Sequence, residues 1–195
     1  LKPEISFYGQ AYDMYDMLGS VVQSVQAHCV FPTPEEFELM SRRKKLWVAH
    51  CPQSNMNANG VAAPIRRYLD AGIHVGLGTD IAGSNTLSMF RTISDTIVAS
   101  KIYWNSMERK GDPFAEKTYL TVSEAFYLAT KGGCSFWGKA GSFEEGSLFD
   151  AVVIDDAPLW DFNNRSLRQR IERVVFQGDE RHTVAKFING RKVYG

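Results

Sequence analysis

The stretch His74-Val75-Gly76-Leu77-Gly78-Thr79-Asp80 decides the fold. An apolar, strand-like run stops there at a carboxylate, and Gly83 and Ser84 follow before a new helical pattern begins. Two earlier apolar runs, residues 25–28 and 46–50, stop in the same way at a histidine. A side chain that can bind a metal or transfer a proton therefore stands at three successive strand ends.

These strands alternate with helical patterns. We expect strands over residues 21–28, 46–51 and 73–80, and the sequence predicts helices over residues 61–71 and from Leu87 to about Met107. Thr33-Pro34-Glu35-Glu36 predicts a further helix start, because Thr can cap a helix and Pro suits its first turn. In a parallel α/β barrel all strand ends face one mouth, where the active site lies. The sequence therefore predicts an α/β fold with chemistry at the carboxyl ends of its strands.

After Gly141 the alternation of strand and helix patterns gives way to patterns that are mainly typical of strands. We expect strands over residues 151–155 and 174–176 and a hairpin that turns at Asn189-Gly190, a pair that accepts the positive φ values of a tight turn. The sequence thus predicts two parts, residues 1–141 as a partial barrel and residues 142–195 as strands of a small β-domain.

Composition excludes several classes of protein. Lys and Arg number 22, and so do Asp and Glu, so no basic face for nucleic acid is indicated. No apolar run approaches the roughly 18 residues of a membrane span, and no secretory signal is visible. We expect a cytoplasmic protein that acts on a small molecule, without nucleic-acid or membrane partners.

The cysteines Cys29, Cys51 and Cys134 are odd in number and lack CxxC spacing, which favours reduced thiols over disulfides. Cys29 and Cys51 directly follow His28 and His50, so a joint zinc site from both pairs is an alternative. Adjacent residues of a strand point to opposite faces. If the histidines face the barrel mouth, the cysteines face the packed helices.

Five polar residues are candidates for the chemistry. Asp80 can bind a metal or accept a proton, or else cap the next helix. His28 and His50 can be ligands, proton shuttles or hydrogen-bond donors to substrate, or else core histidines. Ser54 and Asn55 lie in the expected loop after His50, where they can bind a polar substrate or shape the turn.

We expect the other two histidines, His74 and His182, to lie outside the site. His74 begins its strand and is therefore expected at the opposite end of the barrel. His182 stands among charged residues and is expected on the surface.

Three sequence motifs at the strand ends resemble those of the amidohydrolase superfamily, specifically its guanine deaminase branch. They are Ala27-His28-Cys29-Val30, His50-Cys51-Pro52-Gln53-Ser54-Asn55 and Gly76-Leu77-Gly78-Thr79-Asp80-Ile81-Ala82-Gly83. Residues 124–133, 143–150, 178–181 and 187–191 are similar to later parts of the same family. The choice of guanine depends on Phe7-Tyr8-Gly9, the loop from Asp80 to Met89 and Gly178-Asp179-Glu180-Arg181.

The resemblance implies a zinc or iron enzyme that hydrolyses guanine to xanthine and ammonia and forms a homodimer. Asp80 carries over as metal ligand and proton acceptor, and His28 as the histidine that holds or polarises the purine. His50 has the family's strand-end position. We expect His28, His50 and Asn55 to bind the substrate and Asp80 and His28 to act in catalysis.

Two sequence motifs of the family are absent from this sequence, namely the HxH motif of the first strand and the His-x-x-Glu motif of the fifth strand. We therefore expect the last three strands and helices of a (β/α)8 TIM barrel plus part of the small β-domain. A structural zinc site with four good ligands is worth about 10–16 kcal/mol, so one carboxylate is expected to hold metal weakly or not at all. The chain alone is then expected to be inactive. Alternatives are a non-catalytic barrel fragment, or a related amidohydrolase acting on another amino-purine, a nucleoside or a chlorotriazine.

Overall fold

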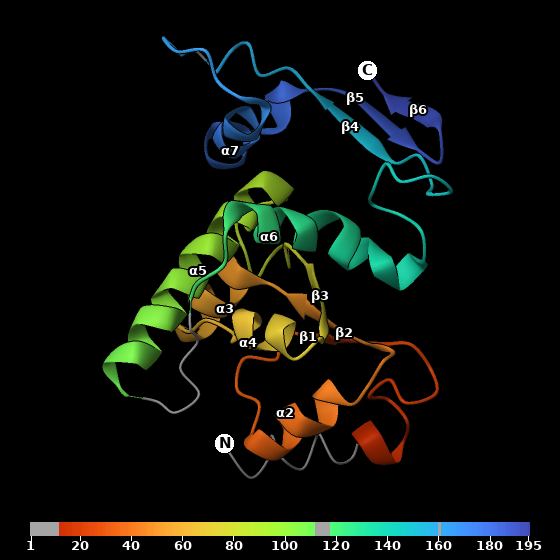
Figure 1. Ribbon diagram of the computed structural model, residues 1–195, viewed down its shortest axis with the longest axis vertical. Helices are drawn as coiled ribbons and strands as arrows, with labels where there is room; N and C mark the ends of the chain where they lie inside the picture. Colours follow the sequence, from red (N-terminus) through yellow and green to blue (C-terminus); the bar gives the residue numbers. More distant parts are fainter. Residues whose placement is uncertain (1–11, 112–117, 160) are drawn as a thin grey trace.

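Two three-stranded sheets, one parallel and one antiparallel, lie apart in the computed structural model, the antiparallel sheet uppermost in Figure 1. The structure describes residues 12–111, 118–159 and 161–195. Phe7-Tyr8-Gly9, on which part of the guanine expectation depends, lies outside these described residues.

The parallel sheet has the strand order β1-β2-β3, with helices between successive strands. Its elements are β1 (Ser24–Ala27), α2 (Pro34–Ser41), β2 (Leu46–His50), α3 (Pro52–Asn59), α4 (Ile65–Asp70) and β3 (His74–Leu77). Ser24 pairs with Leu46, and Trp47 pairs with His74, so the carboxyl ends of all three strands lie at one edge. The expected α/β class is confirmed.

Local sequence explains where the helices begin. The Thr33 side chain accepts a hydrogen bond from the Glu36 backbone, and the Glu36 side chain accepts one from the Thr33 backbone, which forms a capping box before α2. Thr121 and Glu124 form the same box before α6 (Val122–Tyr127). These starts need no long-range contact, and the first lies where Thr33-Pro34-Glu35-Glu36 predicts it.

The main core lies between the parallel sheet and helices α2 and α4. Leu46, Val48 and Val75 are buried in it. Tyr68 of α4 is fully buried and stacks on Phe37 of α2, with ring centroids 5.9 Å apart. This core covers one face of the sheet and so fixes the direction in which the strand-end side chains point.

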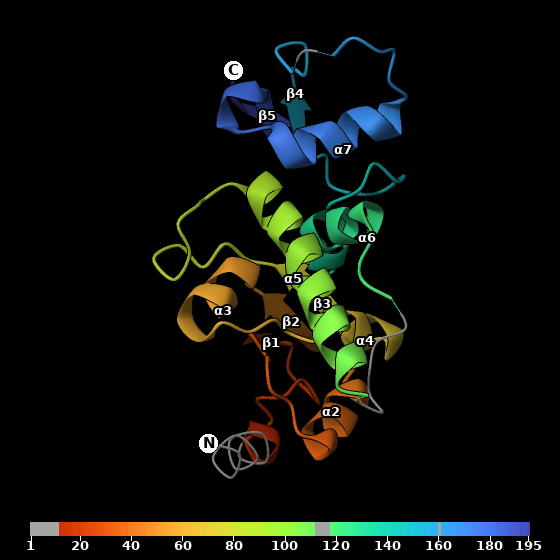
Figure 2. The same cartoon turned by 90° about the vertical axis from the view of Figure 1, so that its left-hand side faces the viewer.

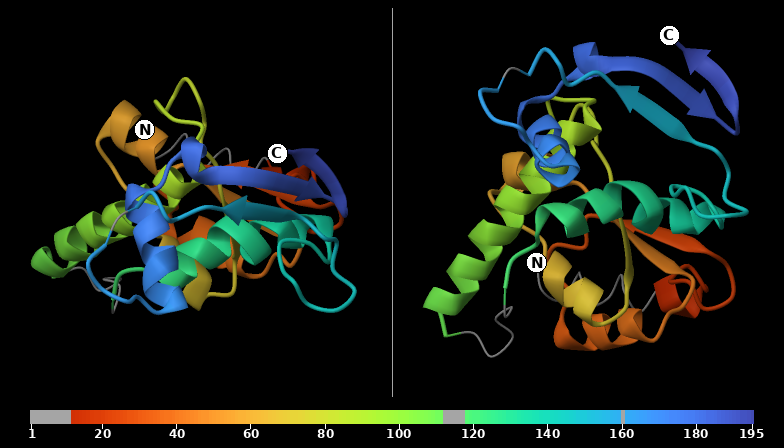
Figure 3. Two further views of the ribbon diagram at one scale, coloured as in Figure 1. Left: turned by 90° about the horizontal axis from the view of Figure 1, so that it is seen from above. Right: turned by 45° about the horizontal axis from the view of Figure 1, so that its top comes forward.

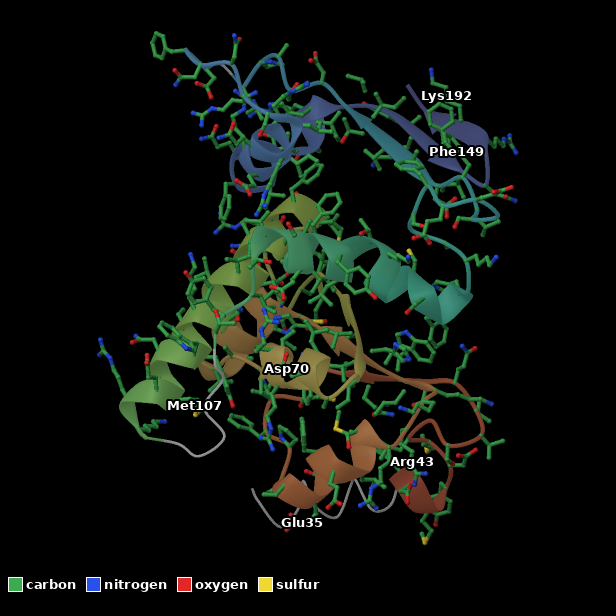
Figure 4. All side chains as sticks on the ribbon, in the orientation of Figure 1. Glu35, Arg43, Asp70, Met107, Phe149 and Lys192 are labelled. Atoms are coloured by element: carbon green, nitrogen blue, oxygen red, sulfur yellow. The ribbon has the colours of Figure 1, made fainter. Side chains whose placement is uncertain are left out.

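Helix α5 (Met89–Arg109) packs against β3 of the parallel sheet. It also contacts α3, α6 and α7 (Leu167–Gln177), and Figure 2 shows it running from beside α7 towards α2. Met107, labelled in Figure 4, lies near the end of α5 that is remote from α7. At 21 residues α5 is the longest described helix, yet neither it nor any other described helix is long and apolar enough to cross a membrane. The π-helix η1 (Leu128–Gly132) and the 3-10 helix η2 (Ser135–Trp137) follow α6.

The expected strand over residues 174–176 is wrong, because these residues belong to helix α7 (Leu167–Gln177). Ser166 caps this helix, and Arg168 pairs with Glu172 one turn later. Val174 and Val175 are buried on the side of α7 that meets α5. A short apolar run suits the buried face of a helix as well as a strand, and here the cap and the packing decide.

The second sheet has the order β4-β5-β6, with β4 (Ala151–Ile154), β5 (Thr183–Ile188) and β6 (Arg191–Tyr194). The expected hairpin is confirmed, since Asn189 and Gly190 have φ values of 47° and 76° between β5 and β6 (Figure 3). His182 ends the 3-10 helix η3 (Glu180–His182) before β5 and is buried beside Asp179, so the expectation of a surface histidine is wrong.

Candidate functional site

His28 and Asp80 lie together at the carboxyl ends of β1 and β3, although β2 separates these strands. His28 Nε2 is 3.8 Å from Asp80 Oδ2, and the two side chains are 42% and 40% exposed. This distance is too long for a direct hydrogen bond. The pair is therefore open to solvent and leaves room for a cation or a shared donor.

The backbone is left-handed at both strand ends. His28 has φ 66°, Cys29 has φ 44° and Asp80 has φ 50°, conformations that are uncommon for residues other than glycine. The Tyr68 hydroxyl donates a hydrogen bond of 2.5 Å to the Cys29 carbonyl and so restrains the first of these turns. Such strain persists only where the surrounding structure holds it, and it concentrates at functional sites.

Ser54 and Asn55 lie on helix α3, and the expectation of a loop there is wrong. Pro52 occupies the first turn of this helix, where its missing N–H costs nothing, and Gly60 ends it in a left-handed conformation. The Ser54 hydroxyl donates to Asp80 Oδ2 at 2.5 Å. His28 Nδ1 donates to Asn55 Oδ1 at 2.8 Å. The same turn of α3 thus holds both strand-end side chains.

The expected orientation of His50 and Cys51 is reversed. His50 follows Leu46 and Val48 in the alternation of β2, on the face that packs into the core, and it is 1% exposed. Cys51 instead lies beside His28 and Asp80, where one donor atom from each of the three falls within 4.8 Å of the others. The thiol, which sequence reasoning assigned to the helix side, therefore belongs to the site.

Burial sets the protonation of these two side chains. It lowers the pKa of His50 to about 3, with a smaller effect from His28, so His50 is neutral at pH 7. Burial, followed by the charge of Asp80, raises the pKa of the Cys51 thiol to about 11. Within the described residues, His50 Nδ1 and Asn55 Nδ2 are buried polar atoms without a hydrogen-bond partner.

A pocket beside β1 and α2 shares His28, Ser54 and Asn55 with this site, whereas Asp80 and Cys51 are not among the residues that line it. Its volume is about 460 Å³, and His28, Ser54, Asn55, Gln26 and Met40 are among the residues that line it. This volume lies within the range that holds small organic ligands. His74, by contrast, lies at the start of β3 and stacks on Trp47 with ring centroids 4.6 Å apart, away from the pocket-lining residues.

The donor set fits a divalent metal in its chemistry. An imidazole nitrogen, a thiol sulfur and a carboxylate oxygen converge from His28, Cys51 and Asp80, and these are the donors that zinc prefers. Protein ligands of zinc typically lie about 2.0–2.3 Å from the ion. The donor atoms of His28, Cys51 and Asp80 lie up to 4.8 Å from one another, so they have to move closer together to share one ion. The described residues therefore offer an open, incomplete ligand set.

The similarity to known proteins extends over nearly the whole chain. The model of the amidohydrolase family matches residues 7–193. The guanine deaminase of Dictyostelium discoideum is 32% identical over 200 residues, which are 99% of this chain and 42% of that protein. The crystal structure of guanine deaminase from C. acetobutylicum with bound guanine in the active site has a TM-score of 0.85 at 39% identity, covering 96% of this chain and 42% of that one.

A third match concerns the fold alone. An adenosine deaminase from Xanthomonas campestris with bound Zn has a TM-score of 0.74 at 24% identity, covering 93% of this chain and 39% of that one. The present chain thus spans less than half the length of each of these relatives.

Proposed function

The chain belongs to the amidohydrolase family, as the motifs at its strand ends indicated, and on that premise we propose that it supplies one half of a guanine deaminase active site. The reaction is the hydrolysis of guanine to xanthine and ammonia, carried out by the intact polypeptide. The observation that carries this proposal is the convergence of His28 and Asp80, 3.8 Å apart, at the carboxyl ends of two parallel strands. The similarity to guanine deaminases from two organisms supports the choice of substrate.

Asp80 and His28 have the chemical roles. Asp80, His28 and Cys51 are the residues present here that could hold a zinc or iron ion, which when bound would activate water at neutral pH. Asp80 is the ligand and proton acceptor, and it passes the proton to the amine that leaves the purine ring. His28 lies beside it and holds the purine in the pocket. Cys51 is a third donor within reach of the same metal.

Asn55 and His50 are proposed to bind the substrate. Asn55 Oδ1 is occupied by His28, while its Nδ2 is buried without a partner in the described structure and remains available as a donor. His50 is neutral and buried and is not among the residues that line the pocket, so a direct contact with the purine requires the site to rearrange. Substitution of either residue tests its role in binding.

The sheet supports the proposal that these strands are the last three of a (β/α)8 barrel. Among the described residues, no strand pairs with the outer edge of β1 or of β3. Val25 of β1 is exposed, and so are Val21 and Val22 just before the strand. Open apolar edges of this kind invite pairing with further strands. In the proposed protein the first five strands close the barrel and bring the remaining metal ligands, while residues 142–195 complete part of a small β-domain.

The remaining properties follow from the same proposal. The intact enzyme is a homodimer, as the family resemblance implies. The three cysteines of the present chain are free, which supports the proposal of a reducing, cytoplasmic location. The chain alone holds metal weakly and has no activity, because the described residues offer an incomplete ligand set.

A direct test compares the 195-residue chain with a polypeptide that adds the upstream coding sequence, searched for HxH and His-x-x-Glu. Metal content is measured by elemental analysis and ammonia release is assayed with guanine, other amino-purines, a nucleoside and a chlorotriazine. We expect about one metal per long chain, activity with guanine, and neither for the short chain. Preference for another substrate would favour the related amidohydrolases, and no activity in either polypeptide would favour the non-catalytic fragment.

A further inference from the structure

Two neighbouring residues of α3 hold the two open strand-end groups. Ser54 donates to Asp80 Oδ2 at 2.5 Å, and Asn55 accepts from His28 Nδ1 at 2.8 Å. Ser54 and Asn55 are 5% and 3% exposed, whereas the side chains they hold are 40% and 42% exposed. Buried, helix-borne side chains therefore restrain two groups that are themselves open to substrate.

The contact with Asn55 determines which nitrogen of His28 carries the proton. A carbonyl oxygen only accepts hydrogen bonds, so Nδ1 of the neutral ring is protonated. Nε2 then presents a lone pair towards Asp80 Oδ2, 3.8 Å away. Two acceptors that face each other attract a cation or an N–H donor between them, and the tautomer thus prepares the site for its ligands.

The contact with Ser54 restrains Asp80 in the same way. The hydroxyl occupies Oδ2, which leaves the second carboxylate oxygen, Oδ1, for another partner. Gly83 makes room for this contact, since a Cβ atom there would lie 2.8 Å from both Asp80 Oδ2 and Ser54 Oγ. The backbone of Asp80 is left-handed, a strained conformation that persists only where the surrounding structure holds it, and the hydrogen bond from Ser54 is one such restraint.

We propose that Ser54 and Asn55 are the positioning residues of this site, Ser54 for the carboxylate of Asp80 and Asn55 for the Nδ1–H tautomer of His28. Neither touches the reacting atoms in this role. The functional meaning rests on the proposed deaminase activity, whereas the tautomer and the carboxylate contact are properties of the chain itself.

Gln53 provides a matched control on the same helical turn. Its side chain donates to Asn85 Oδ1 at 2.7 Å and accepts from the Asn85 backbone at 2.7 Å. Gln53→Ala removes this link between α3 and the loop after β3 but leaves the hydrogen bonds of Ser54 and Asn55 in place.

The first measurement is NMR of the 195-residue chain labelled with ¹⁵N and ¹³C, in alkaline buffer where free imidazole is neutral. His28 is assigned by its loss in His28→Gln. We expect the Nδ1–H pattern in the unsubstituted chain, its loss in Asn55→Ala, and no change in Gln53→Ala. The carboxyl ¹³C resonance of Asp80 is expected to move in Ser54→Ala and to stay in Gln53→Ala. An Nε2–H pattern, or insensitivity to Asn55→Ala or Ser54→Ala, overturns the corresponding assignment.

The second measurement is steady-state kinetics of the intact polypeptide. Ser54→Ala and Asn55→Ala are expected to lower kcat by about 10- to 100-fold, as substitutions behind metal-site residues do. Ser54→Ala is expected to change KM much less, whereas Asn55→Ala also raises KM, because Asn55 Nδ2 is proposed to donate to the purine. Ser54→Thr keeps the hydroxyl and is expected to recover most of the rate. Full kcat in Ser54→Ala or Asn55→Ala overturns the positioning role. If the unsubstituted enzyme deaminates no purine, the proposed function fails while the NMR result still decides the two contacts.

Discussion

The imidazole of His28 faces the carboxylate of Asp80 across the end of β2, with 3.8 Å between Nε2 and Oδ2. The two residues end non-adjacent strands, and a right-handed sequence of parallel strands and crossover helices is what brings them to one edge. Both have left-handed backbone, and each is held by one residue of α3. This relationship is the basis of the predictions that follow.

Asp80→Asn is expected to abolish activity of the intact polypeptide without unfolding it. Asn adopts left-handed backbone readily, so the turn at φ 50° is preserved. The amide is a poor metal ligand and cannot accept the proton, and loss of proton transfer alone costs about 10²- to 10⁴-fold in rate. Initial rates with guanine, together with far-UV circular dichroism of the variant, check this. A variant that retains its rate would contradict the role of Asp80.

The two cysteines near the site are expected to react slowly with iodoacetamide at pH 8. Burial raises the pKa of Cys29 to about 12 and that of Cys51 to about 11, from an ordinary value of 9.0. Two pKa units lower the thiolate fraction of Cys51 roughly 100-fold, since only the thiolate attacks. Mass spectrometry of native and urea-unfolded chain measures the difference in alkylation rate. Equal rates in both states would show that these thiols are not buried as described.

Glu124 is expected to make stability fall in acid. The hydrogen bond from Arg66 lowers the pKa of Glu124 to about 2 from an ordinary value of 4.5, so the ion pair stabilises the folded chain above pH 4.5 and is lost as pH falls towards 2. Because the Glu124 side chain is 36% exposed, we expect roughly 1 kcal/mol from the pair. Urea unfolding at pH 6 and pH 3 measures the loss.

The variant Glu124→Gln distinguishes the contribution of the Arg66–Glu124 ion pair to stability from that of the capping box with Thr121. Gln keeps the capping box with Thr121 but has no charge, so the difference in unfolding free energy between the two pH values is expected to shrink. Glu144→Gln removes the exposed pair with Lys131 and is the matched control, expected to leave the pH dependence nearly unchanged. An unaltered pH profile in Glu124→Gln would assign the acid sensitivity to other carboxyl groups.

Two glycines are expected to respond differently to replacement by alanine. A Cβ at Gly76 would lie 2.8 Å from the Gly133 Cα, so Gly76→Ala has to separate β3 from η1 and is expected to destabilise the fold by about 1–3 kcal/mol. A Cβ at Gly83 meets the Asp80 and Ser54 side chains instead. Gly83→Ala is therefore expected to reduce activity more than stability.

Chemical denaturation and initial rates of both glycine variants decide between these effects. The pattern expected is a lower urea midpoint for Gly76→Ala and a lower kcat at a nearly unchanged midpoint for Gly83→Ala. The reverse pattern would mean that the Asp80–Ser54 contact does not matter to the site.

Local sequence predicted most elements of the parallel sheet. The expected strands over residues 21–28, 46–51 and 73–80 contain the observed β1, β2 and β3, and the helix start at Thr33 lies where expected. Each of these signals acts over a few neighbouring residues, through turn chemistry, capping or an apolar run. The same short-range rules misassigned residues 174–176, because an apolar run of three is compatible with a strand and with the buried face of α7.

The sequence by itself determined the alternation of strands and helices, the hairpin at Asn189-Gly190 and the polar residues that end β1 and β3. Only the tertiary structure decided which side chains meet: Cys51 rather than His50 lies beside Asp80, and Ser54 and Asn55 hold residues 26 and 27 positions away in the chain. The physical reason is that periodicity assigns residues to alternate faces but does not say which face is covered. That choice follows from the burial of Leu46 and Val48 against α2 and α4, a packing of whole elements that the periodicity of one strand does not specify.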